Sequence, residues 1–81
     1  MTPPAMRDAR IAKALGARIA ARRKAAGHNR LQFARLSEIT WANLQAYEEG
    51  RKLPELDTLR RICQGFGLTL SGFLRGIEGE I

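Results

Sequence analysis

Cysteine and histidine are scarce in this 81-residue chain, which contains one of each, Cys63 and His28. A single cysteine cannot form an internal disulfide, and these two residues cannot supply the ligand cluster of a structural metal site. The sequence also lacks a glycine-rich loop of the kind that holds phosphate groups before a helix. Glu48 and Glu49 are adjacent, and a structural role explains them better than acid-base chemistry. We therefore expect no enzyme activity, no metal and no cofactor.

Long hydrophobic runs are also missing. The longest stretch without a charged residue, Ile62 to Leu74, spans 13 residues and contains three glycines. A membrane-spanning helix needs about 20 apolar residues, and a secretory signal needs an apolar block that the N-terminus lacks. Cys63 falls within an apolar helical pattern, which indicates a buried thiol in a reducing compartment. We expect a soluble, cytoplasmic protein with no membrane partner.

Acidic residues are scarce in the first part of the chain. Residues 1–35 contain nine basic residues and one acid, whereas residues 36–81 contain five basic and seven acidic residues, for a net charge of +6. A basic half on a small domain favours a polyanionic partner, and a well-solvated basic helix is the alternative. Charge alone does not distinguish DNA from RNA or from an acidic protein.

Hydrophobic spacing and capping residues predict an all-α fold of five short helices. Ile11, Leu15 and Ile19 repeat at helical spacing in the alanine-rich first helix, within which Gly16 indicates close packing against another helix. Asn29 and Gln32 form a capping-box pattern before the second helix. The expected helices cover residues 8–26, 30–36, 41–49, 55–66 and 70–74.

One domain accounts for most of the chain. We expect a flexible arm over residues 1–7, a compact domain over residues 8–75 and an uninformative tail over residues 76–81. A chain of this size has a thin core, which dimerisation would supplement. The buried face of the fourth helix is expected to consist of Leu56, Leu59, Ile62, Cys63 and Phe66.

The central stretch, residues 33–50, predicts two short helices joined by a tight turn. Phe33, Ala34 and Ser37 face inward from the first of them, and Leu44 and Tyr47 do so from the second. Thr40 caps the second helix, which leaves an outward face for other residues. A short helix whose first turn is held clear of its own core can enter a DNA major groove. The outward face consists of Trp41, Ala42, Gln45 and Ala46.

This pattern resembles the phage-repressor and Cro-like (XRE) helix-turn-helix family over about residues 15–75. The residues that carry the resemblance are Leu15-Gly16, Ile19, Arg23, Gly27, Phe33-Ala34, Ile39-Thr40, Leu44, Tyr47-Glu48, Gly50, Pro54, Leu59, Ile62, Gly67-Leu68-Thr69 and Phe73-Leu74. The resemblance implies a compact five-helix DNA-binding domain, commonly homodimeric, whose third helix contacts the major groove.

By position, the resemblance also implies the roles of individual residues. Arg23 and Glu48 match a structural salt bridge between the first and third helices. The expected base-contacting residues are Thr40, Trp41, Ala42, Gln45 and Ala46. From their chemistry and their place beside the third helix, the residues expected to contact phosphate are Arg30, Gln32, Asn43, Arg51 and Lys52. Asn43 is chemically as able as Gln45 to contact a base, but its spacing turns it partly toward the second helix.

Several positions depart from the family pattern. Arg30 replaces a glutamine that often binds phosphate, and arginine can still make that contact. Glu38 replaces the usual turn glycine, so we expect a strained or altered turn. Leu31 and Leu36 replace polar residues, which makes them either lightly exposed positions or part of a partner surface.

The expected function is that of a transcriptional regulator that binds double-stranded DNA sequence-specifically as a homodimer. We expect a bacterial or phage repressor that occupies a roughly palindromic operator. The dimer surface is expected at Leu70, Phe73 and Leu74. The alternative is an antitoxin or accessory module that binds a toxin or other protein through Leu31, Leu36 and Trp41. Trp41 itself has three interpretations: a DNA contact, a cover for the turn, or a protein contact.

Overall fold

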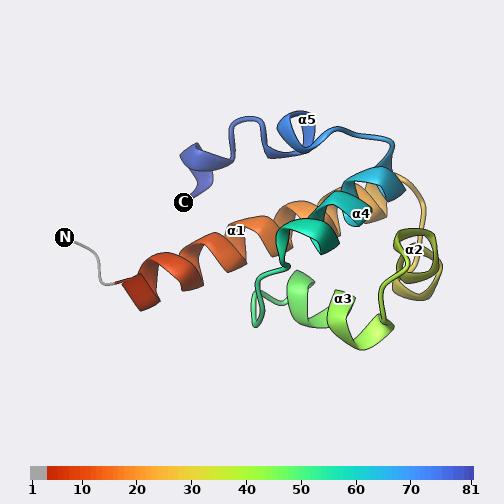
Figure 1. Ribbon diagram of the computed structural model, residues 1–81, viewed down its shortest axis with the longest axis horizontal. Coiled ribbons are helices and arrows are strands. Elements are labelled where there is room, and N and C mark those ends of the chain that lie inside the picture. Colours follow the sequence, from red (N-terminus) through yellow and green to blue (C-terminus); the bar gives the residue numbers. More distant parts are fainter. Residues whose placement is uncertain (1–3) are drawn as a thin grey trace.

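The computed structural model describes the backbone of residues 4–81 and the side chains of residues 8–81. All regular structure in residues 4–81 is helical, which confirms the predicted all-α fold (Figure 1). The elements are α1 (Pro4–Ala25), α2 (Arg30–Ser37), α3 (Trp41–Glu48), α4 (Leu56–Phe66), α5 (Leu70–Leu74) and a short 3-10 helix, η1 (Ile77–Glu80).

The two ends of the chain differ from the sequence prediction. Helix α1 begins at Pro4 and not at Asp8, because proline is well tolerated in the first turn of a helix, where its missing N–H is not needed. Of the predicted arm over residues 1–7, residues 1–3 lie outside the described residues and the rest are helical. The predicted tail forms η1, which packs against α1.

A single arginine of α1 holds that C-terminal segment. The Nη1 atom of Arg18 donates hydrogen bonds to the carbonyl oxygens of Phe73 at 2.9 Å and Arg75 at 2.6 Å. Its Nη2 atom lies 2.7 Å from Oε1 of Glu80, in an ion pair. Ile77 packs against the core beside these contacts. The C-terminal segment is therefore part of the folded domain.

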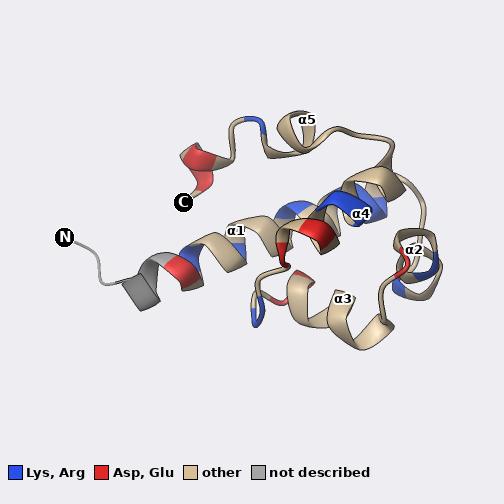
Figure 2. Cartoon of the chain, in the orientation of Figure 1, with Lys and Arg blue, Asp and Glu red and all other residues tan. Residues whose placement is uncertain are grey.

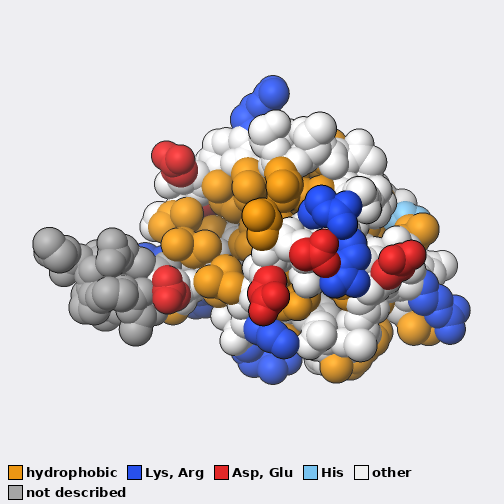
Figure 3. Space-filling view, viewed as in Figure 1, with side chains coloured by type: hydrophobic (Ala, Val, Ile, Leu, Met, Phe, Trp, Pro, Cys, Tyr) orange, Lys and Arg blue, Asp and Glu red, His pale blue; other side chains and the backbone are white. Residues whose placement is uncertain are grey.

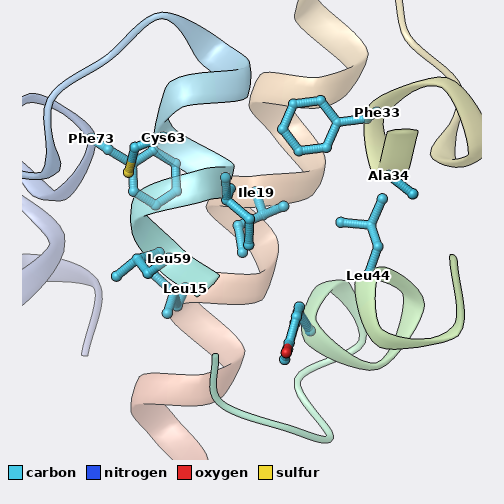
Figure 4. Close-up of a cluster of buried hydrophobic side chains, with 10 residues drawn as sticks. Leu15, Ile19, Phe33, Ala34, Leu44, Leu59, Cys63 and Phe73 are labelled. Carbon is cyan, nitrogen blue, oxygen red and sulfur yellow. The ribbon is translucent and has the colours of Figure 1, made fainter. Parts of the chain in front are cut away.

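The core lies where all five α-helices meet (Figure 4). Ile19 occupies its centre, with Phe33 and Leu44 on one side and Cys63 and Phe73 on the other. Phe66 extends the packing, since its ring stacks on Phe33 with a centroid distance of 4.3 Å and on Phe73 at 5.8 Å. Burial raises the pKa of the Cys63 thiol, so this residue is an inert apolar filler, as predicted.

Helices α1 and α3 approach each other closely at Gly16. A Cβ atom at this position would lie 2.1 Å from the carbonyl oxygen of Tyr47 and 3.0 Å from that of Glu48. Only glycine permits this backbone-to-backbone contact, which confirms the predicted role of Gly16. The contact sets the position of α3 against α1.

One predicted core residue is on the surface. Leu56 was expected on the buried face of α4, but it is 70% exposed. It is the first residue of α4, at the end of the apolar stripe, where the core no longer reaches the helix. Leu59, Ile62 and Cys63 are buried as predicted.

Candidate nucleic-acid interface

Helices α2 and α3 are short, and each begins with a complete side-chain cap. The Asn29 side chain accepts a hydrogen bond from the Gln32 amide at 2.8 Å, and the Gln32 side chain accepts one from the Asn29 amide at 2.9 Å. This is the predicted capping box. At α3, the Thr40 hydroxyl accepts from the Asn43 amide at 3.1 Å. These caps satisfy orphan amides and fix where both helices begin.

The turn between α2 and α3 has a left-handed residue. Glu38 has φ 57° and ψ 42°, and within residues 4–81 it is the only residue other than glycine with positive φ. The predicted strained turn is therefore present, at a cost of about 1 kcal/mol for a residue with a Cβ atom. Arg61 of α4 offsets this cost, because its Nη1 atom donates a hydrogen bond to the Glu38 carbonyl at 2.8 Å.

A buried carboxylate joins the first three helices. Arg23 of α1 donates from Nε and Nη2 to the two carboxylate oxygens of Glu48, at 2.6 and 2.9 Å. Arg30 of α2 donates from Nε to Oε1 of the same carboxylate at 2.9 Å. Arg23 also donates to the His28 carbonyl. The Glu48 side chain is 1% exposed, so α1, α2 and α3 share one buried ionic cluster, Arg23–Glu48–Arg30.

The electrostatics of this cluster favour the charged forms. Burial by itself would raise the pKa of Glu48, but hydrogen bonds from Arg23 and Arg30 outweigh it, and the pKa lies below its ordinary value. The hydrogen bond to Glu48 raises the pKa of Arg23 against the opposing effect of burial. Glu48 therefore stays ionised at neutral pH and holds both arginines.

The outward face of α3 presents three of the predicted base-contacting side chains. Trp41 is 45% exposed, Ala42 is exposed, and Gln45 is partly exposed. Thr40 is exposed directly before them, with its hydroxyl engaged in the cap and its methyl group as the remaining contact surface. The first turn of α3 thus carries an apolar and amide surface without charge.

Ala46 was wrongly placed on this face. It is 8% exposed and belongs to the buried side of α3, together with Leu44 and Tyr47. The chain reverses after Gly50, and the Arg51 amide donates to the Ala46 carbonyl at 3.0 Å, so the following loop lies against this end of the helix. Ala46 is therefore too buried to contact a base.

Basic residues flank α3 without belonging to it (Figure 2). Arg30 is the first residue of α2, and Arg51 and Lys52 lie in the loop after α3. The Arg51 Nε atom is 2.9 Å from Oε1 of Glu49, and Gln45 Nε2 donates to the other oxygen of the same carboxylate at 3.2 Å. The hydrogen bond from Arg51 lowers the pKa of Glu49.

Asn43, a predicted phosphate contact, faces this basic loop. Its Oδ1 atom accepts a hydrogen bond from Lys52 Nζ at 3.3 Å. The same ammonium lies 5.9 Å from the centroid of the Tyr47 ring. The side-chain oxygen of Gln32, Oε1, accepts the capping-box hydrogen bond from the Asn29 amide. The side-chain nitrogen, Nε2, is therefore the group of Gln32 that can donate to a phosphate.

The arrangement has the parts of a motif in which the second of two short helices is presented for the major groove. A family model described as a helix-turn-helix domain matches residues 14–72, which is more than half of the chain. The chain belongs to this helix-turn-helix domain family. No curated protein and no solved structure matches the chain.

The matched residues include the whole of α2 and α3, the two short helices joined by the turn at Glu38. The match is consistent with the resemblance drawn from the sequence. Within the described residues, no helix of the domain is long and apolar enough to cross a membrane. No group of three or more histidine, cysteine, aspartate or glutamate side chains between residues 8 and 81 could hold a metal ion.

The predicted dimer surface of the helix-turn-helix domain needs one correction. Phe73 is 0% exposed and packs in the core against Phe66, so it cannot contact a second copy. Leu70 and Leu74 are partly exposed at the edge of the core. Figure 3 shows hydrophobic side chains gathered between the C-terminal segment, α1 and the start of α4. Leu56 is the most exposed large apolar residue of the domain.

Two arginines that stabilise the helix-turn-helix domain were not predicted from the sequence. Arg18 fixes the C-terminal segment, and Arg61 fixes the Glu38 carbonyl. Both contacts join residues more than 20 positions apart, so no local pattern indicates them. The one available signal is Asp57, which lies four residues before Arg61 and pairs with it at 3.4 Å.

Proposed function

We propose that the protein is a sequence-specific, double-stranded DNA-binding regulator that inserts α3 into the major groove. The single observation that carries the proposal is the exposed, uncharged first turn of α3, capped at Thr40 and flanked by basic residues on both sides. The helix-turn-helix family match supports the same conclusion. The proposed mechanism is repression, in which the bound protein occupies an operator.

The residues of α3 recognise the DNA sequence. Gln45 can pair its amide with adenine, after releasing its hydrogen bond to Glu49, and contributes roughly 1 to 3 kcal/mol of discrimination. Ala42 and the Thr40 methyl suit a thymine methyl group. Trp41 offers a flat apolar surface to the same groove and an indole N–H to a phosphate.

The residues around α3 supply most of the affinity for DNA. Arg30 and Gln32 at the start of α2 contact one phosphate segment, and Arg51, Lys52 and Asn43 contact another beyond α3. Such contacts neutralise backbone charge, release counterions and carry no sequence information. The division predicts that base-contacting and phosphate-contacting residues have different mutational signatures.

Two copies would place two α3 helices in successive major grooves of a roughly palindromic site. We assign the dimer surface to Leu56, Leu70 and Leu74, because these apolar side chains are exposed or partly exposed around α4 and α5. A homodimer also compensates for the thin core of a chain of this size. We place this regulator in the cytoplasm.

Selection of bound fragments from a random duplex pool tests the function. We expect enrichment of a two-fold symmetric sequence. Gln45→Ala should relax preference at one position of each half-site, whereas Arg51→Ala should weaken all sequences alike. Equal and uniform losses from both variants would refute the division of roles, and no enrichment at all would refute sequence-specific binding.

A second candidate function, an antitoxin or accessory module that binds a toxin or other protein, has one observation in its favour. Leu31, Leu36 and Trp41 are all exposed on α2 and α3, which is unusual for large apolar side chains on so small a surface. In that case Trp41→Ala would abolish binding to the protein partner, and duplex DNA would not bind at any salt concentration.

A further inference from the structure

We propose that Glu48 is a positioning residue for the phosphate contact of Arg30: the buried carboxylate holds Nε of Arg30 and leaves both Nη groups directed to the DNA backbone. This inference rests on the proposed function, because it concerns how one of its phosphate contacts is prepared. It gives Glu48 a role in DNA binding beyond the structural salt bridge with Arg23.

The carboxylate is a fixed point. Both of its oxygens accept hydrogen bonds from Arg23, which is itself 7% exposed and tied to the His28 carbonyl at 3.0 Å. The third bond, from Nε of Arg30 to Oε1 at 2.9 Å, therefore connects a surface arginine to a rigid, buried partner. One end of the Arg30 guanidinium is fixed before any DNA arrives.

The other end of the same guanidinium is free. The Arg30 side chain is 31% exposed, and among residues 8–81 no hydrogen bond engages its Nη1 or Nη2 atom. A guanidinium is planar and rigid, so fixing Nε also fixes the direction of the two Nη groups. These two groups carry four N–H donors, which can make the paired contact to phosphate oxygens that arginine favours.

Arg30 also occupies the place where such a contact is useful. It is the first residue of α2, directly after the Asn29 cap, so its side chain and the helix start present positive charge to the same region. The hydrogen bond to Glu48 brings this residue together with the C-terminal end of α3. Glu48 therefore couples the phosphate contact to the position of α3.

The Arg30→Lys substitution keeps the positive charge at this position but removes the planar guanidinium that Glu48 orients. The lysine ammonium is a single donor atom, and Glu48 is 1% exposed, so a lysine that reaches Glu48 is withdrawn from the surface. Arg35 is the matched control, because it lies on the same helix, is exposed, and makes no side-chain hydrogen bond within the described residues. The experiment compares Arg30→Lys, Arg30→Gln and Arg35→Lys with the wild type.

The measurement is the salt dependence of binding to a selected duplex, by fluorescence anisotropy. Each phosphate contact adds about 0.9 to the slope of log affinity against log salt, so a dimer that loses two contacts loses about 1.8. We expect this reduction, with a roughly tenfold weaker affinity, in both Arg30→Gln and Arg30→Lys, and wild-type behaviour in Arg35→Lys.

Three outcomes would overturn the inference. Arg30→Lys could keep the wild-type slope and affinity, which would make Arg30 a plain point charge. Arg30→Gln could leave the salt slope unchanged, which would show that Arg30 does not contact a phosphate. Arg30→Lys and Arg35→Lys could weaken binding equally, which would show a general preference for arginine. Failure of the proposed function is distinct, since the wild type itself would then show no salt-dependent binding.

Discussion

Gly16→Ala is the substitution for which the structure and helix propensity make opposite predictions. In an exposed helix interior, replacing glycine by alanine stabilises by about 1 kcal/mol. Here the new Cβ atom would lie 2.1 Å from the Tyr47 carbonyl oxygen, whereas ordinary van der Waals contact begins at 3.4 Å. Because the opposing atom is backbone, α1 and α3 would have to separate by about 1.3 Å, the difference between these two distances.

The expected net effect is a loss of stability of up to about 2 kcal/mol. Overpacking of this kind costs about 1 to 3 kcal/mol, and the helix-propensity gain of about 1 kcal/mol offsets part of it. At the upper value the free energy of unfolding falls by about 2 kcal/mol, which lowers the Tm by about 8 to 16 °C in a domain of this size. The displaced backbone includes Glu48, so DNA affinity should fall as well.

Urea denaturation followed by circular dichroism measures the effect. Ala17→Gly is the matched control, because Ala17 is the exposed neighbour of Gly16 and its replacement should cost only the propensity term of about 1 kcal/mol, without weakening DNA binding. A Gly16→Ala protein that is more stable than the wild type would refute the close α1–α3 contact on which the placement of α3 depends.

Three other perturbations test separate parts of the account. The pKa of Glu48 is lowered in the folded state, so its contribution to stability is complete above the unfolded value of about 4.3 and is lost as pH falls below it. Urea titrations at several pH values should show this acid-side loss, and Glu48→Gln should reduce it. Ser37→Ala should change the free energy of unfolding by less than about 1 kcal/mol or raise it, since the buried Oγ has no hydrogen-bond partner within residues 8–81; a larger loss would reveal a partner. Leu56→Glu should dissociate the proposed dimer in sedimentation equilibrium and leave the helical content intact, whereas a variant that dimerises as the wild type does would exclude this surface.

Local chemistry made much of the fold predictable. The capping pairs, the apolar repeat of α1 and the glycine at position 16 each have a physical requirement that involves only a few neighbouring residues. The strained turn at Glu38 was predicted in another way, from the family resemblance, in which a glycine usually occupies this position. These features fixed where α2 and α3 begin and how they face each other.

The errors at Ala46, Leu56 and Phe73 have a common cause. Helical periodicity locates the middle of a buried stripe and leaves its edges ambiguous, and burial of these residues depends on segments distant in sequence. Ala46 is covered where the chain turns back after α3, and Leu56 precedes the point where the core meets α4. Helix α5 has five residues, too few to show a period, so the inward direction of Phe73 was not predictable.

The ionic contacts were predictable only in part. The resemblance paired Arg23 with Glu48, and the structure joins them through two hydrogen bonds. It gave no indication of the third partner, because Arg30 stands where a different residue is usual and its bond spans 18 positions in the sequence. The hydrogen bond between Arg30 and Glu48 therefore could not be predicted from the sequence.

The most direct test of the central claim, that this helix-turn-helix domain binds duplex DNA through α3 and its basic flanks, is the affinity of the wild type for random duplex at low and moderate salt. Three phosphate contacts in each subunit, by Arg30, Arg51 and Lys52, give a dimer a slope of about −5.4, so affinity should fall roughly a thousandfold between about 50 and 200 mM salt. Absence of detectable binding at about 50 mM, where phosphate contacts are strong, would contradict the account.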